Sequence, residues 1–386
     1  MSAHAFLAPS SAGRWVRCAL SASLEAAYPE TEASPSSLEG TAAHWVVQML
    51  LQGTPVALDM QAPNGVAVTD EMLEAAVLVR DDILATLGPD WAKYLVVEQR
   101  VQIPRVHPTH NWGTPDYRAW SRLNNGRLCL HVWDFKFGHG IVEAFENWQL
   151  IDYTAGLLDE AGINGLTDQE TVVDMVVIQP RAFHREGPVR RWRVVASDLR
   201  GHINRLSNQA GLAVGANPPA VPTPEGCENC RGRHACEALQ RAAYQAADKG
   251  QNYGALDLSP HALGLELRAL KRSQALLEAR VSGLEAEATA KIKRGELVPF
   301  WILDSTPGRL AWQKPAAEIL ALGQMLGLDL AKPQDVITPT QAKAVAKTAK
   351  VSGDIFDAYA ARPAGTAKLT FDDGQKARLT FSTSNT

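Results

Sequence analysis

One segment constrains the fold of this chain more than any other. Leu128–Phe137 is apolar or aromatic at every position except His131, Asp134 and Lys136. Such a run is typical of a β-strand that is covered on both faces of its sheet. Because side chains alternate along a strand, Asp134 and Lys136 point to the same side. This places a carboxylate and an ammonium together in an otherwise apolar element, where unpaired charges are costly.

A second carboxylate, Asp116, follows Gly113–Pro115 at the start of the preceding predicted strand. Two carboxylates and a lysine at the end of a small sheet can hold a divalent metal ion and help a water molecule attack a phosphodiester. A structural ion pair between Asp116 and Lys136 explains the same three residues, because ion-pair networks mimic active sites. Gln149 and Tyr153, four residues apart on the next predicted helix, share one of its faces.

A histidine follows a glycine by one turn on an upstream predicted helix, at Gly40 and His44, and Ser36–Glu39 has the pattern of a capping box. A single helical histidine is more often an ordinary core or surface residue than a ligand. However, the order GxxxH, GxxD, DxK and QxxxY is similar to that of the RecB/Cas4-type branch of the PD-(D/E)XK nuclease superfamily, over roughly residues 1–240. The whole chain also resembles an uncharacterised family of phage-encoded RecB-like nucleases. Asp134 departs from the pattern, since many members have Glu there.

This resemblance implies an α/β (α+β) fold: a restriction-endonuclease-like core, whose mixed central sheet is flanked by helices, followed by a mainly helical C-terminal extension. The implied activity is metal-dependent hydrolysis of DNA, by an exonuclease that processes ends in phage recombination or replication. Lys136 would orient or help deprotonate the attacking water, and Gln149 and Tyr153 would position the scissile backbone. The implied ligands of Mg²⁺ or Mn²⁺ are His44, Asp116, Asp134 and the backbone carbonyl of Phe135.

The cysteines also form a pattern. Cys227, Cys230 and Cys236 are spaced C-x2-C-x5-C after a proline-rich segment, and such thiolate sets bind zinc or an iron–sulfur cluster. The resemblance to Cas4- and AddB-type nucleases implies that Cys18 is the fourth ligand of a [4Fe–4S] cluster that joins the two ends of the nuclease domain. Structural Zn²⁺ is the alternative, for which His234 could replace a cysteine. Cys129, by contrast, is expected to be a small core residue.

A net charge of −4 over 386 residues excludes general electrostatic attraction to DNA, so any contact must use a local basic patch. The candidate patch interleaves five arginines with Phe183 and Trp192, a combination that can follow a phosphate backbone and stack on bases. A solvated hairpin is the alternative explanation. The five arginines are Arg181, Arg185, Arg190, Arg191 and Arg193.

Two domains are expected, a nuclease domain over 1–240 and a helical region with a terminal hairpin over 241–386. The N-terminal residues have no signal-peptide or membrane-anchor pattern, which predicts a cytoplasmic protein, in the host cell if phage-encoded. The expected partners are linear DNA ends or single-stranded DNA, with phage recombination or single-strand-binding proteins. The alternative function is a non-catalytic nucleic-acid-binding module that keeps the fold and the structural metal cluster. Locally, the sequence predicts strands over 94–103 and 172–178 and a helix over 70–88.

Overall fold

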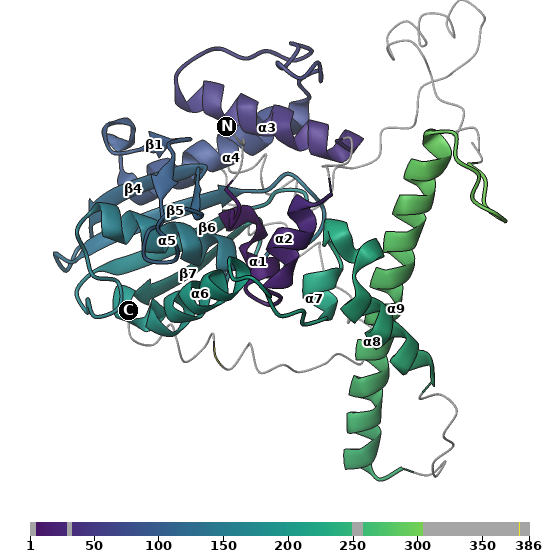
Figure 1. Cartoon of the computed structure of the whole chain (residues 1–386). Helices are drawn as coiled ribbons and strands as arrows, with labels where there is room; N and C mark the ends of the chain where they lie inside the picture. The colour runs from purple at the N-terminus through teal and green to yellow at the C-terminus, as the bar shows by residue number, and fades with distance from the viewer. Residues whose placement is uncertain (1–4, 29–32, 249–257, 304–377, 379–386) are drawn as a thin grey trace, which may run out of the picture. The chain divides into compact units, whose positions relative to one another are not determined.

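The computed structural model describes residues 5–28, 33–248, 258–303 and Arg378. A mixed five-stranded sheet lies at its centre, with the strand order β1-β4-β5-β6-β7 (Figure 1). Strands β5 and β6 are parallel, and the other neighbouring pairs are antiparallel. The strands are β1 (Val96–Val97), β4 (Tyr117–Arg122), β5 (Leu128–Phe135), β6 (Val172–Ile178) and β7 (Val189–Val195).

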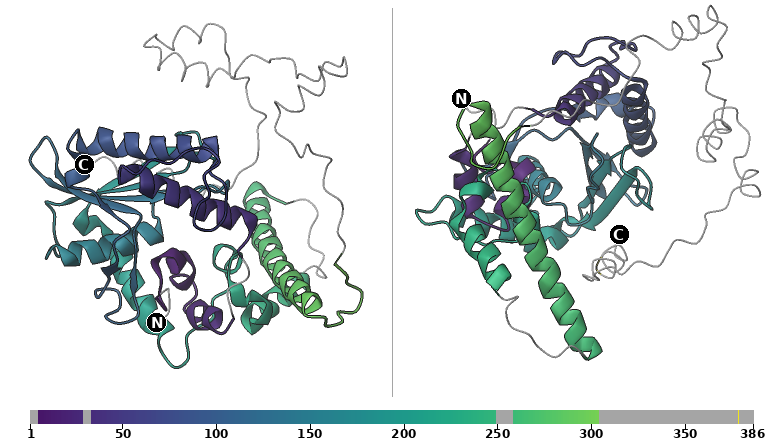
Figure 2. Two further views of the ribbon diagram at one scale, coloured as in Figure 1. Left: turned by 90° about the horizontal axis from the view of Figure 1, so that it is seen from above. Right: turned by 90° about the vertical axis from the view of Figure 1, so that its right-hand side faces the viewer.

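Helices cover both faces of this sheet, as the apolar run in β5 predicts (Figures 1 and 2). One face packs against α3 (Pro35–Leu51) and α4 (Asp70–Leu87), and the other against α5 (Trp148–Glu160) and α6 (Arg200–Ala213). A short 3-10 helix, η3 (Ala196–Leu199), leads from β7 into α6. The expectation of a mixed sheet flanked by helices is therefore confirmed.

Alternation along β5 divides its side chains between the two cores. Leu130 and Val132 belong to the core with α5 and α6, whereas Trp133 and Phe135 belong to the core with α3 and α4. Helix α3 starts earlier than expected: its N-cap is Ser34, whose side chain accepts a hydrogen bond from the N–H of Ser37. Pro35 then occupies the first helical position, where its missing N–H costs nothing.

The prediction of a single strand over 94–103 is wrong, because this segment forms two short strands that belong to different sheets. Strand β1 ends at Val97, and β2 (Val101–Gln102) pairs instead with β3 (Trp112–Gly113). Between them Glu98 has a φ of 50°, in the left-handed region that a continuous strand does not use. The short helix η2 (Trp91–Lys93) precedes β1.

The N-terminal segment and the cysteine-containing loop are neighbours, although they are far apart in the sequence. The N-terminal segment forms η1 (Pro9–Ser11), α1 (Ala12–Trp15) and α2 (Leu20–Ala26). Helix α1 contacts α7 (Pro224–Cys227), and α2 contacts η4 (Arg231–Ala235). Helices α8 (Glu237–Asp248) and α9 (Pro260–Lys293) continue from this loop, and α9 packs on α7, η4 and α8.

Packing continues past residue 240, since α8 and α9 belong to the same compact unit as the sheet. The helical C-terminal region is thus present as far as α9. The expected terminal hairpin lies outside the described residues. None of the helices that the structure describes is long and apolar enough to cross a membrane.

Candidate metal centre

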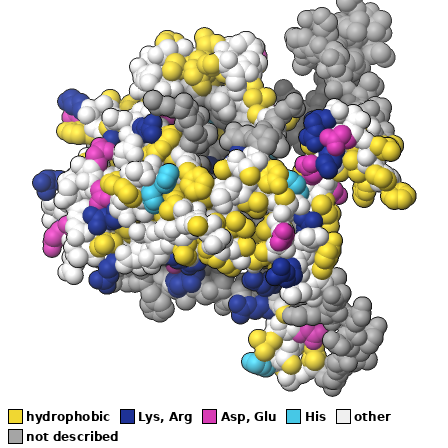
Figure 3. Space-filling view, in the orientation of Figure 1, with side chains coloured by type: hydrophobic (Ala, Val, Ile, Leu, Met, Phe, Trp, Pro, Cys, Tyr) yellow, Lys and Arg dark blue, Asp and Glu magenta, His cyan; other side chains and the backbone are white. Residues whose placement is uncertain are grey.

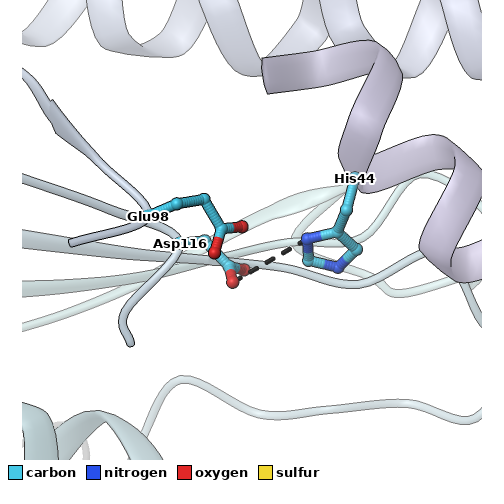
Figure 4. A group of neighbouring side chains, drawn as sticks. All are labelled: His44, Glu98 and Asp116. Carbon is cyan, nitrogen blue, oxygen red and sulfur yellow. Dashed lines mark ion pairs between the residues drawn. The ribbon is translucent and has the colours of Figure 1, made fainter. Parts of the chain in front are cut away.

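Three side chains from separate segments converge at one end of the central sheet. They are His44 from α3, Glu98 from the turn after β1, and Asp116 immediately before β4 (Figure 4). One potential ligand atom from each lies within 4.8 Å of the other two. Nδ1 of His44 and Oδ1 of Asp116 are 3.8 Å apart. An imidazole and two carboxylates are a donor set that fits a divalent cation.

A proline next to Asp116 explains how its carboxylate reaches this position. The β4–β5 register pairs Tyr117 with Trp133, so its continuation would place Pro115 opposite Phe135. The N–H of Phe135 points toward β4 and donates a hydrogen bond to Oδ2 of Asp116, with 2.7 Å between N and Oδ2. The N–H and C=O of one strand residue point to the same side, so the Phe135 carbonyl also faces β4. Pro115, which would lie opposite it, has no N–H to donate to this carbonyl. The carbonyl is thus a possible fourth ligand.

Asp134 and Lys136 lie on the same side, as strand alternation predicts, and they form an ion pair in which Nζ of Lys136 is 2.9 Å from Oδ1 of Asp134. Gln149, on α5, completes this contact: Nε2 donates to Oδ1 of Asp134 at 2.9 Å, and Oε1 accepts from Lys136 at 3.3 Å. The other carboxylate oxygen of Asp134, Oδ2, is buried and has no hydrogen-bond partner among the described residues. A buried carboxylate oxygen without a hydrogen-bond partner lowers the stability of the folded protein unless a cation or a water molecule binds it.

The ionisation of these groups reflects the crowding of negative charge. Burial, and next the charge of Asp116, raise the pKa of Glu98 to about 7, although His44 offsets part of this effect. Burial also raises the pKa of Asp134, against the influence of Lys136. For Lys136, burial lowers the pKa, but the charges of Asp134 and Asp116 outweigh it and the net pKa is raised. Lys136 therefore stays an ammonium ion at neutral pH.

Tyr153 holds the loop that carries Asp116. Its hydroxyl donates to the carbonyl of Thr114 at 3.0 Å, and the side chain is only 6% exposed. A Cβ at Gly113 would lie 2.8 Å from Cε1 of Tyr153 and 2.9 Å from Pro9, so only glycine fits between them. Gln149 and Tyr153 thus hold the acidic residues in place, and their role in positioning the DNA backbone stays a prediction.

The five candidate DNA-binding arginines do not form one free basic face. Arg190 is 2% exposed and donates to the carbonyl of Val142 and to Gln179, because the alternation of β7 turns it inward beside Trp192. Arg191 and Arg193 point to the opposite face and both donate to Asp174.

The remaining two arginines are also engaged within the chain. Arg181 forms ion pairs with Glu39 of α3 and Glu71 of α4, and its guanidinium lies 3.8 Å from the ring centroid of Phe137. Arg185 pairs with the neighbouring Glu186 at 3.4 Å. Their contact with DNA stays a prediction.

A second polar cluster, which the sequence did not indicate, occupies the other end of the sheet. Ser121 Oγ is 2.8 Å from Nε2 of His131, and Nδ1 of His131 is 3.0 Å from Asp174. Arg191 and Arg193 hold the same oxygen of Asp174, so this carboxylate is neutralised by neighbouring cations. Burial alone would raise the pKa of Asp174. The hydrogen bond with His131 and the charges of Arg191 and Arg193 outweigh burial and lower this pKa to about 2.

The four cysteines of the expected metal site line one small cavity, together with apolar residues such as Leu20, Leu24 and Leu239. The N–H of Val221 approaches Sγ of Cys18 at 3.4 Å, and that of Leu239 approaches Sγ of Cys236 at 3.5 Å. No three of the four sulfur atoms lie within 4.8 Å of one another. Burial raises the pKa of Cys227 to about 11 and that of Cys230 to about 12. Cys129 lies apart in β5 and is fully buried, as expected for a core residue.

The sequence reading left two residues out of the site. Glu98 belongs to no motif in the sequence, but its carboxylate is part of the converging set, at an exposed position. Tyr117 has a buried hydroxyl without a partner among the described residues. Burial, followed by the charges of Asp116, Glu98 and Asp134, raises its pKa well above the usual phenol value, which indicates that the hydroxyl is close to the acidic residues.

The comparisons with known proteins do not identify an activity. Residues 4–377 match a family described as "Protein of unknown function (DUF2800)". A solved structure described as "Crystal structure of SSO0001" is 13% identical, with 60% of this chain and 85% of that chain covered and a TM-score of 0.29. This similarity assigns neither a fold nor an activity.

Proposed function

We propose that this chain, which belongs to the DUF2800 family of proteins of unknown function, is a metal-dependent nuclease that hydrolyses phosphodiester bonds at DNA ends with a PD-(D/E)XK-type site. One observation carries the proposal. Asp134 has one oxygen held by Lys136 and Gln149 and the other buried without a partner, at the end of the sheet where His44, Glu98 and Asp116 converge.

The charges of this site support a cation rather than an internally balanced ion-pair network. Three carboxylates are accompanied by one ammonium group and by the imidazole of His44. If Asp116 and Lys136 served only as a structural ion pair, Lys136 would contact Asp116, whereas its hydrogen bonds go to Asp134 and Gln149. Hard oxygen ligands with one imidazole suit Mg²⁺ or Mn²⁺.

The residues that would hold this metal are His44, Glu98, Asp116, Asp134 and the carbonyl of Phe135. When bound, the ion would supply Lewis acidity and lower the pKa of a coordinated water. The ammonium of Lys136 would orient that water and stabilise negative charge developing on the phosphate. Its protonated state makes this role more favourable than that of a base. Gln149 fixes Lys136 and Asp134 in place, and Tyr153 fixes the Asp116 loop.

The cysteine cavity supports a [4Fe–4S] cluster as the second cofactor. Tetrahedral zinc with Zn–S bonds of about 2.3 Å would bring its sulfur ligands to about 3.8 Å from one another. No three of these sulfurs lie within 4.8 Å of one another, which favours a polynuclear cluster over a single zinc ion. His234 is a poor substitute ligand, since Nδ1 is 3.2 Å from the carbonyl of Arg231 and its ring packs on Tyr28 with centroids 4.4 Å apart.

Incubation of anaerobically purified protein with DNA tests the proposed activity. Linear DNA labelled at its ends should be degraded with Mg²⁺ or Mn²⁺ and stay intact with EDTA. Covalently closed circular DNA of the same sequence is the matched control, and an exonuclease should leave it uncut. Binding of linear DNA without cleavage under every metal condition would overturn the proposal in favour of a non-catalytic binding module.

A further inference from the structure

Helix α9 has one face buried within its own chain. Leu276 and Ala279 pack with Cys227 and Leu239, and a Cβ at Gly283 would lie 2.6 Å from the side chain of Arg233. This face attaches the helix to the cysteine loop. The rest of α9 has no comparable cover among the described residues, and hydrophobic side chains reach the surface along it (Figure 3).

Six apolar residues outside this face follow a heptad pattern. They are separated alternately by four and three residues, apart from one polar position, Gln274. Of the five whose side chains are exposed, Leu267 is the least exposed at 37% and Leu270 the most at 60%. We call this set the α9 stripe: Leu263, Leu267, Leu270, Leu277, Val281 and Leu284.

We propose that the α9 stripe binds the same stripe of a second copy of this chain, as a parallel two-stranded coiled coil. The stripe covers about three heptads and is about 32 Å long at 1.5 Å per residue, which meets the length that such a seam requires. An amphipathic helix that served only its own chain would need one apolar face. Helix α9 has two, and among the described residues only the face with Leu276 and Ala279 packs against the rest of the chain.

Polar residues along the stripe favour self-association over an unrelated partner. Gln274 occupies an a position, where a polar residue pairs with its own counterpart and specifies the register of a parallel dimer. Glu266 and Lys271 occupy successive g and e positions, so each would face the opposite charge on the other helix. Both are exposed. Arg280, at a later g position, is already bound to the carbonyl of Arg233 at 3.2 Å and contributes no pair.

Sedimentation equilibrium of the full-length, cofactor-loaded protein tests this surface. The wild type should have twice the mass of the chain at micromolar concentration. Leu270→Asp should raise the dimer Kd at least about 30-fold, because each helix would bury an unpaired carboxylate. Leu265→Asp is the matched control, since Leu265 is 56% exposed on the same helix but lies off the stripe, and it should leave the Kd unchanged. A monomeric wild type, or equal effects of the two variants, would overturn the proposal.

Two further pairs of variants keep the test valid if Leu270→Asp lowers folding yield. Lys271→Glu should weaken the dimer, and adding Glu266→Lys should restore it. Leu270→Cys should form a disulfide between copies, whereas Leu265→Cys should not. A dimer in which Leu270→Cys fails to cross-link would overturn the parallel arrangement.

Discussion

The acidic site and the cysteine cavity are each assembled from segments distant in the sequence, but they are held in different ways. Asp116 is fixed by a backbone N–H of the central sheet, and Asp134 by Lys136 and Gln149, within two large hydrophobic cores. The cysteines lie between short helices whose own core is the small cluster of Cys227, Leu239, Leu276 and Ala279. The first site should therefore be preorganised without metal, whereas the second should depend on its metal for stability.

Substitution in the acidic site should give the largest effect, on activity alone. Asp116→Ala should reduce metal-dependent cleavage by more than about 100-fold, because even the outer partners of metal ligands contribute 10- to 100-fold. Its thermal unfolding should stay close to that of wild type, since the sheet holds the surrounding elements. Asp81→Ala, at an exposed aspartate of α4, is the control and should leave cleavage unchanged. Full cleavage by Asp116→Ala would contradict the assignment.

Substitution in the cysteine cavity should mainly lower stability, although the cavity is separate from the acidic site. Cys18→Ala should lose iron, from about four atoms per chain to almost none, because the cluster needs all four thiolates. The Tm should fall by about 5 °C or more, the shift expected when a domain of this size loses 2–3 kcal/mol. Wild-type protein should be brown when purified without oxygen.

Cys129→Ala provides the matched control, as Cys129 is a buried cysteine outside the cavity. It should retain its iron even if the core is slightly destabilised. One zinc per chain in the wild type would assign the cavity to the zinc alternative, and full metal content in Cys18→Ala would show that Cys18 is no ligand.

Local patterns predicted the elements that local physics determines. Strand β6 covers Val172–Ile178 as its β-branched run indicates, and α4 begins and ends within one residue of its predicted limits. The DxK pair at the end of β5 was also predictable, because strand alternation alone places Asp134 and Lys136 on the same side. In contrast, the position of Glu98 depends on a positive φ between two sheets, which its sequence does not signal.

The partners of the arginines in the basic patch could not be predicted from the sequence. Arg190, Arg191 and Arg193 are close in sequence, but strand alternation separates Arg190 from the other two. Their acceptors come from elsewhere in the chain, for example Asp174 on β6. Composition could identify the positive charge, but not the internal acceptors that engage it.

Removing a residue that only orients the acidic site should have an intermediate effect. Gln149→Ala leaves Asp134 and Lys136 paired but without their shared hydrogen-bond partner, so cleavage should fall about 10- to 100-fold. The loss should appear mainly in kcat, because Gln149 acts through Lys136. Gln102→Ala, at an exposed glutamine of β2, should have no effect. A larger loss than that of Asp116→Ala would mean that Gln149 contacts the substrate directly.

The smallest expected effect concerns Glu98 and distinguishes the acidic site from a purely structural cluster. Because its pKa is raised to about 7 in the folded protein, the folded state binds more protons than the unfolded state between about pH 4.5 and 7. The contribution of Glu98 to stability therefore falls as pH rises through this window, and the ionised carboxylate destabilises the metal-free protein above it. Glu98→Gln should consequently raise the Tm in EDTA at pH 8 but not at pH 4.5, and it should weaken Mn²⁺ binding at pH 8. Glu74→Gln, at an exposed glutamate of α4, should change neither quantity. Equal changes in Tm at the two pH values would show that ionisation of Glu98 is not what destabilises the site, and unchanged Mn²⁺ affinity would remove Glu98 from the ligand set.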